Sequence, residues 1–288
     1  MTLDHAEATT PSTDRPDPGP PRLQRAWGQA MALVGASRRG PVERTGIRRL
    51  HQAGCVKLRF PRLPRAACEA VVINTSGGLT GGDQICMEFD VEPGAALTVT
   101  TQACERVYRS SGGTASVDVS LRLRAGATLA YLPQETILFD GGRLSRRLDL
   151  DAAADSRFLL AESVLLGREA MGESVHEGAI ADRWRLRRDG RLIFAEDLKL
   201  SGAVGSIAAL SSTLGGARAF STLVWQGPEP GAMLARVRRD LEATEGASLV
   251  DGLLVVRIVA QDGYRLRKRL MPMLALLAQA PLPLVWSL

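Results

Sequence analysis

The sequence is poor in the residues that build catalytic centres. It has only three histidines, and no H-E-x-x-H helix that could hold a catalytic zinc ion. No serine lies in a nucleophile-elbow motif. The four cysteines are widely spaced and form no C-x-x-C pair: Cys55, Cys68, Cys86 and Cys104. We therefore expect free thiols in a reducing compartment, and neither a zinc hydrolase nor a serine hydrolase.

Aromatic residues and lysine are also scarce. Aromatics make up 5% of the chain, and three of its 36 basic residues are lysine. The net charge of +5 and the pI of about 9.4 fit nucleic acid, an anionic membrane or an acidic protein equally well. Arginines cluster at 183–188 and 265–269, but no known nucleic-acid-binding motif accompanies them. We interpret both clusters as solvated or partner-facing, and expect no nucleic-acid partner.

Long apolar runs are missing as well. The most apolar stretch, 270–288, is interrupted by Pro272, Pro281 and Pro283, so it does not read as a transmembrane helix. The N-terminus is polar and acidic, unlike a secretory signal. These features predict a cytoplasmic protein with no membrane partner. Residues 1–21 are rich in Pro, Asp and Thr, and we predict a disordered tail with order beginning near Leu23.

What the chain does contain is a repeating β pattern. Residues 84–91 and 115–123 alternate apolar and polar side chains, which is typical of half-buried strands. Each is followed by a turn and a more apolar strand, starting at Gly94 and at Gly126, 32 positions apart. Weaker copies follow at 146–162 and at 183–198, the latter with an Asp189-Gly190 hairpin turn.

The repeats predict a mainly β fold of about four stacked, hairpin-like units, either two packed layers or a β-helix-like stack. An ordinary β-sandwich with accidental internal similarity stays open. After Gly227 the pattern changes to a helix over 233–241, a buried strand over 252–260 and a helix over 264–279. We predict a single domain over 22–288, with a β body at 22–227 and a small strand-and-helix cap at 228–288.

The glycine-rich stretch "VVINTSGGLTGGDQ" (71–84) resembles a phosphate-binding loop only superficially. It lacks the lysine of a P-loop and the spacing of a dinucleotide-binding motif, and it leads into a strand rather than a helix. Two glycine pairs fit a tight turn in a β protein. We interpret Asp83 as a turn-capping residue, with a metal or proton ligand as the alternative.

Polar clusters follow the second strand of each unit. They are Gln102 and Glu105, Gln134 and Glu135, Glu162, and Glu196 and Asp197. If the units stack in register, these groups gather along one edge, where with Cys104 they could lodge or pass a divalent cation. A solvated acidic edge is the structural alternative. Paired carboxylates could also serve a β-solenoid carbohydrate-active enzyme, although no aromatic platform supports that reading.

Four longer motifs carry a family resemblance. They are "INTSGGLTGGD" at 73–83, "TTQACERVYRS" at 100–110, "LPQETILFDGGRL" at 132–144 and "GREAMGE" at 167–173. Their order and spacing, and the ending "PLPLVWSL", resemble the urease accessory protein UreD (UreH) family over roughly residues 22–288.

The resemblance implies a function that composition alone does not reveal. UreD-like proteins are non-enzymatic scaffolds with a mostly β, β-helix-like fold. They bind apo-urease together with UreF and the GTPase UreG, and help to deliver nickel into the urease active site. GTP binds UreG only, and no cofactor is bound tightly to the scaffold. The glycine loop would then belong to a family whose nucleotide sits on a partner.

The resemblance also implies an internal passage for nickel in transit. Mapped onto the motifs, the candidate passage-lining groups are Thr75, Ser76, Glu135, Asp140, Glu169 and Glu173. Each has a simpler alternative: turn capping for Thr75 and Ser76, the Asp-Gly-Gly turn for Asp140, and pairing with arginine for Glu169 and Glu173. The absence of metal-cage spacing fits transit better than storage.

Overall fold

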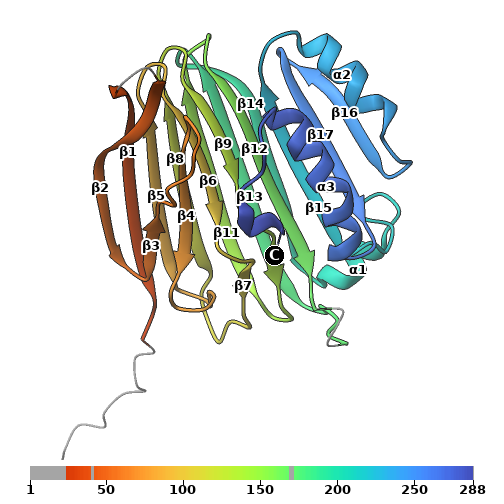
Figure 1. Ribbon diagram of the computed structural model, residues 1–288. Helices are drawn as coiled ribbons and strands as arrows, with labels where there is room; N and C mark the ends of the chain where they lie inside the picture. Colours follow the sequence, from red (N-terminus) through yellow and green to blue (C-terminus); the bar gives the residue numbers. More distant parts are fainter. Residues whose placement is uncertain (1–23, 40–41, 169–171, 288) are drawn as a thin grey trace, which may run out of the picture.

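Two large β-sheets face each other and make up most of the molecule (Figure 1). The computed structural model describes residues 24–39, 42–168 and 172–287. The first sheet runs, in spatial order, β14 (Arg191–Gly202), β13 (Gly178–Arg188), β11 (Arg143–Ala152), β8 (Ala115–Leu123), β5 (Gln84–Val91), β1 (Trp27–Arg39) and β2 (Val42–Gly54). The predicted tail at 1–21 lies outside the described residues.

The second sheet runs β16 (Glu245–Val250), β17 (Leu253–Ala260), β15 (Ala219–Gln226), β12 (Arg157–Leu166), β9 (Thr128–Leu132), β6 (Ala96–Thr101), β4 (Cys68–Asn74) and β3 (Val56–Arg59). Two short strands lie off this path, β7 (Glu105–Val107) and β10 (Thr136–Leu138), and β10 pairs with both β7 and β12. The described helices are α1 (Val204–Ala209), α2 (Pro230–Arg239), α3 (Gly263–Ala278) and the 3-10 helix η2 (Leu284–Ser287).

The middle of the chain winds between the sheets as stacked coils. β5, β8, β11 and β13 pair in parallel in the first sheet, while β4, β6, β9 and β12 do so in the second. Gln84 pairs with Ser116 and Ala96 with Thr128, so both sheets reproduce the 32-residue offset seen in the sequence. The predicted mainly β, β-helix-like stack is confirmed.

The units differ from hairpins in one respect. Their two strands lie in opposite sheets, so the turns after β5, β8 and β11 carry the chain across the core rather than joining hydrogen-bonded neighbours. Only the last unit, β13–β14, is an antiparallel hairpin, closed by Asp189 and Gly190 as predicted. Alternation identifies the buried face of a strand but not the strand that it pairs with. A hairpin and a turn that joins strands of opposite sheets therefore have the same sequence pattern.

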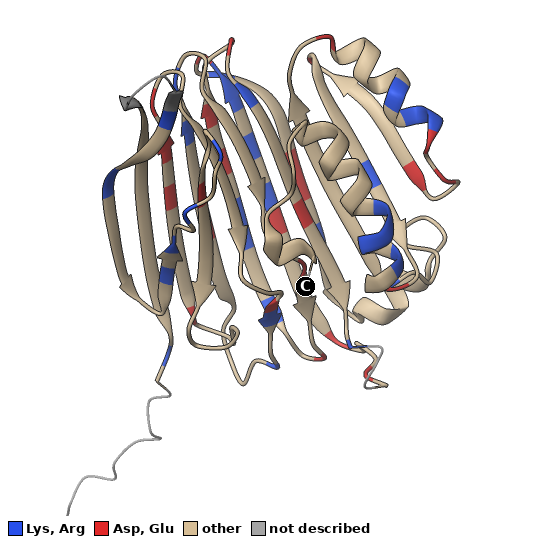
Figure 2. Ribbon diagram, in the orientation of Figure 1, with Lys and Arg blue, Asp and Glu red and all other residues tan. Residues whose placement is uncertain are grey.

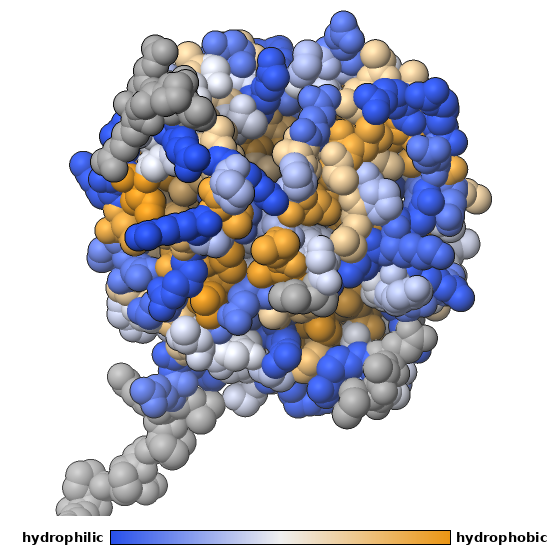
Figure 3. Space-filling model, viewed as in Figure 1, coloured by the Kyte–Doolittle hydropathy of each residue, from blue (hydrophilic) through white to orange (hydrophobic). Residues whose placement is uncertain are grey.

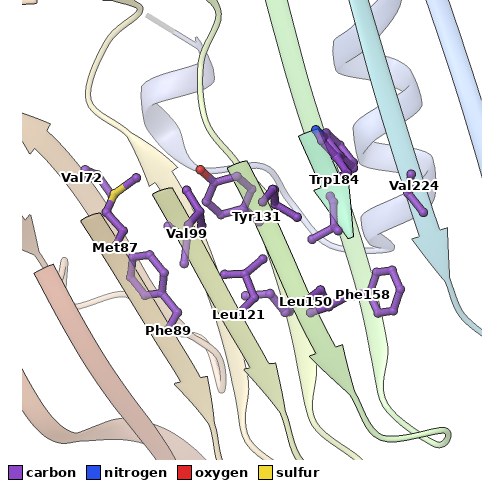
Figure 4. Packing of buried hydrophobic residues seen from close by; sticks show 14 of the residues in the cluster. Val72, Met87, Phe89, Val99, Leu121, Tyr131, Leu150, Phe158, Trp184 and Val224 are labelled. Atoms are coloured by element: carbon purple, nitrogen blue, oxygen red, sulfur yellow. The ribbon is translucent and has the colours of Figure 1, made fainter. Parts of the chain in front are cut away.

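Inward-facing apolar residues of both sheets form the main core (Figure 4). Phe89, Leu121 and Leu150 from the first sheet pack against Val99 and Phe158 from the second. A second core lies on the outer side of the second sheet, where α3 covers β15 and β17. The helices and strand predicted after Gly227 are present, and the sequence pattern missed β16 beside them.

The glycine stretch forms a tight turn between β4 and β5. A Cβ on Gly81 would lie 1.9 Å from Ser110 Oγ and 2.3 Å from the Gly112 carbonyl oxygen, so only glycine allows the two loops this approach. Asp83 accepts hydrogen bonds from the backbone N–H groups of Thr80 and Ala26, both at 2.8 Å. The turn-capping interpretation of Asp83 is confirmed.

Candidate functional site

A cavity of about 170 Å³ lies between the two sheets. The first sheet contributes Ile85, Met87, Val117, Leu144 and Arg146 to its wall; the second contributes Val72, Tyr131 and Glu162. Gly77, Gly78, Gln102 and Gln134 line it from the connections at the ends of the strands, and Glu105 lines it from the short strand β7. Three of the four family motifs therefore meet at this cavity, although they lie far apart in the sequence.

One arginine of the cavity wall, Arg146, holds two buried carboxylates. Arg146 on β11 makes ion pairs with Glu162 on β12 and Asp182 on β13, and its Nε lies 3.1 Å from Asp182 Oδ1. Trp184 Nε1 also donates to Asp182 Oδ1, at 3.1 Å. All three charged residues are more than 90% buried. A charge triad in the core can persist because each member is paired and hydrogen-bonded.

Burial dominates the electrostatics of this triad. Desolvation raises the pKa of Glu162 to about 8, against the opposing attraction of Arg146. It also raises the pKa of the neighbouring Tyr131 phenol. Burial thus favours the protonated carboxyl group, while Arg146 favours the carboxylate, the form that offers an oxygen ligand of the kind that divalent cations prefer.

A second carboxylate lines the cavity from β7. Glu105 accepts hydrogen bonds from Asn74 Nδ2 at 3.1 and 3.2 Å, and burial raises the pKa of its carboxyl group. Cys104 lies beside it, with its Sγ 3.3 Å from Glu135 Oε2. Burial, followed by the charge of Glu135, raises the pKa of the Cys104 thiol to about 11. Cys104 is therefore a neutral thiol at physiological pH, a weak ligand rather than a thiolate.

The structure places Thr75, Ser76 and Glu135 next to the cavity residues but not among them. Thr75 Oγ1 donates to the carbonyl oxygen of Cys55 at 2.9 Å, and Ser76 Oγ donates to Asn74 Oδ1 at 2.6 Å. Glu135 is buried, and Arg267 of α3 donates to both of its oxygens, at 2.9 and 3.1 Å. In this structure, Thr75 and Ser76 stabilise turns, and Glu135 attaches α3 to the body of the protein.

The remaining predicted residues lie in the loops at the same end of the stack. Asp140 accepts hydrogen bonds from the backbone N–H groups of His176 and Glu177, which lower the pKa of its carboxyl group, and it pairs with Arg109. Glu173 pairs with Arg168 at 3.1 Å. Glu169 lies outside the described residues. Neither Asp140 nor Glu173 lines the cavity.

Some of the cavity residues were within reach of sequence reasoning. Gln102, Glu105, Gln134 and Glu162 belong to the polar clusters that the stacking hypothesis had brought together. Glu196 and Asp197 instead lie on β14, where Glu196 pairs with Arg257 and Asp197 with Arg185.

Arg146 and Asp182 were not predicted from the sequence. Both occupy inward positions of alternating strands, Arg146 between Leu144 and Leu148 and Asp182 between Ile180 and Trp184. A charge at a core-facing position was the signal that could have revealed them.

Most arginines of the two clusters considered for nucleic-acid binding form ion pairs with acidic residues of the same chain. Arg183 and Arg185 pair with Asp197, and Arg187 pairs with Asp149. Arg265, Arg267 and Arg269 pair with Asp262, Glu135 and Glu245. Across the described ranges, no three His, Cys, Asp or Glu side chains are grouped closely enough to hold a metal ion. None of the helices described is both long and apolar enough to cross a membrane.

These features define a class of protein: a β-solenoid-like body whose polar groups converge on an internal cavity. Comparison with known proteins is more specific. The family model described as "UreD urease accessory protein" matches residues 29–287. The chain therefore belongs to the UreD family of urease accessory proteins, and the resemblance seen in its motifs is confirmed.

Its relatives share most of its length. A urease accessory protein UreD from Rhizobium leguminosarum bv. viciae is 53% identical over 247 residues, covering 85% of this chain and 90% of the relative. The protein of that name from Agrobacterium fabrum is 46% identical over 271 residues, covering 93% and 94%. That from a Chelativorans species is 45% identical over 279 residues, covering 96% and 99%.

Proposed function

We propose that this protein is a non-enzymatic scaffold of urease maturation in the cytoplasm. It binds apo-urease together with UreF and UreG, and GTP hydrolysis on UreG drives delivery of nickel into the urease active site. Family membership supports the accessory role. The observation that carries the nickel part of the proposal is the internal cavity lined by Glu105 and Glu162.

The chemistry of the cavity suits a cation in transit rather than a resident cofactor. Glu105 already accepts hydrogen bonds from Asn74, and Glu162 is already paired with Arg146. An entering nickel ion must compete with those partners, which weakens its binding and lets it leave again. In this proposal Thr75, Ser76, Glu135, Asp140, Glu169 and Glu173 remain candidate groups for the passage beyond the cavity.

The burial of the triad argues against a carbohydrate-active enzyme. A glycosidase needs two carboxyl groups that flank an accessible sugar chain. Glu162 and Asp182 are instead both bound to Arg146 in the core, where a polysaccharide cannot reach them.

Complementation tests the proposal. A urease operon lacking its own UreD gene is supplied with this chain, and urease activity and nickel per urease active site are measured. We expect both to be restored. If the wild-type chain is folded but restores neither and binds neither UreF nor apo-urease, the scaffold role is wrong.

A cavity variant tests the nickel route separately. Glu105→Ala should lower nickel per active site several-fold while the variant still binds its partners, because one of the two cavity carboxylates is gone. Glu177→Ala, an exposed glutamate outside the cavity, is the matched control and should behave like wild type. Unchanged nickel in Glu105→Ala would remove the cavity from the route without affecting the scaffold role.

A further inference from the structure

Positive charge is concentrated in one short part of the chain. Residues 44–68 contain seven Lys and Arg residues and no Asp or Glu, whereas the rest of the sequence has 29 basic and 31 acidic residues. The basic character of the protein therefore comes from this segment alone. It comprises most of β2, then β3 and the connection that follows β3.

The segment lies at one end of the sandwich, and most of its charge faces solvent. Arg44, Arg48 and Arg49 on β2 are exposed, as are Arg59 and Arg62 beyond it. Among the described residues the segment makes two ion pairs, Arg48 with Glu92 at 3.6 Å and Arg65 with Glu69 at 3.8 Å. Figure 2 shows the resulting basic bands on the strands at the left-hand end.

Strand β2 also exposes apolar side chains on the face that points toward the core. Ile47 and Leu50 are opposite Val34 and Ala32 of β1, which are fully buried. A bulge at this point lets both side chains share the inner face of the sheet. Yet Ile47 is 42% exposed and Leu50 is 41% exposed. The second sheet therefore does not cover the inner face of the first sheet at β2. Figure 3 shows apolar surface at this end.

β2 is also an edge strand. It pairs with β1 on one side and is the last strand of the first sheet. Thr45 N–H donates to the carbonyl oxygen of Ala66, which occupies one backbone group near the start of β2. The exposed Arg48–His51 stretch follows it. An edge of this kind can accept a further strand through main-chain hydrogen bonds.

We propose that β2 is a docking edge for an acidic, extended segment of a partner protein, which adds a strand to the first sheet beside Arg48–His51. Acidic side chains of the segment pair with Arg44 and Arg49, and its apolar side chains cover Ile47 and Leu50. A second copy of this chain is a poor occupant, because antiparallel β2–β2 pairing would bring arginine next to arginine. The inference is independent of the nickel cavity, to which β2 contributes no residue.

A peptide probe tests this inference on the full chain. The probe is a short peptide alternating glutamate and valine, titrated up to millimolar concentration and followed by fluorescence anisotropy. The same peptide with alternate backbone nitrogens methylated cannot complete the hydrogen-bond ladder. We expect binding of the first peptide, and at least about tenfold weaker binding of the methylated one.

Charge variants locate the site. Arg44→Glu/Arg48→Glu/Arg49→Glu should weaken peptide binding by at least about tenfold, with a steep salt dependence in wild type. The matched control, Arg124→Glu/Arg157→Glu/Arg236→Glu, makes the same change in net charge at exposed arginines elsewhere and should bind as wild type. Ile47→Ser/Leu50→Ser should also weaken binding, because the apolar cover is lost.

Four outcomes would overturn the inference. The first three are no binding of the unmethylated peptide, equal binding of both peptides, and equal loss in the two arginine triples. The fourth is equally tight binding of duplex DNA or of vesicles with anionic lipid, which would show a general polyanion surface. Circular dichroism of each variant separates loss of binding from loss of fold.

Discussion

At the scale of single residues, Glu162 is the group whose protonation the fold controls most directly. It is buried beside Arg146 and Tyr131, and burial raises the pKa of its carboxyl group to about 8. A carboxyl group whose pKa rises on folding binds its proton more tightly in the folded state than in the unfolded chain. Its contribution to stability is therefore full at low pH and is lost as the pH rises through the folded pKa.

The variant Glu162→Gln should remove this pH dependence. Between about pH 5 and about pH 8, the wild-type free energy of unfolding should fall relative to that of the variant by on the order of 3 kcal/mol. Urea denaturation at several pH values measures the difference. Glu177→Gln, at an exposed position, is the control and should track wild type throughout. A constant gap between wild type and Glu162→Gln would contradict the assigned shift.

At the scale of elements, the C-terminal segment holds the outer face of the second sheet. Trp286 is 1% exposed, and its Nε1 donates to Thr100 Oγ1 at 3.2 Å and to the carbonyl oxygen of Leu132 at 3.3 Å. Arg267 of α3 lies over the Trp286 ring at 5.3 Å and also holds Glu135. Gln134, which lines the cavity, donates to the carbonyl oxygen of Val285. The C-terminus, α3 and the cavity wall are thus one connected unit.

Truncation of this anchor should be costly. Trp286→Ala should destabilise the protein by about 3–5 kcal/mol, because it removes a large buried ring and leaves the Thr100 and Leu132 oxygens without their donor. Leu284→Ala, two positions away and 66% exposed, should change stability by less than about 0.5 kcal/mol. Thermal unfolding of both variants provides the comparison. Similar melting temperatures would mean that the C-terminal segment is not an anchor.

The sequence predicted strands well where one face of the strand is buried and the other is exposed to solvent. β5 and β8 show this alternation over their whole length and were located nearly to the residue. β2 and β16 are among the strands that were not predicted; both are edge strands that are largely exposed and carry no clear period-2 signal. The site was predicted in part: stacking of polar clusters pointed to Glu105 and Glu162. The alternation of β11 places Arg146 on the inner face, but its pairing with Glu162 and Asp182 depends on the sheet register, which no local pattern encodes.

At the scale of the whole molecule, stability comes from stacked coils whose described part begins at residue 24. The segment 1–21 has almost no apolar side chains, so it has little to contribute to a core. Deleting residues 2–21 should therefore leave the melting temperature within error of wild type. Since the segment has four acidic residues and one arginine, deletion should also make the protein more basic and strengthen its retention on a cation exchanger. A large drop in melting temperature would show that these residues pack against the body.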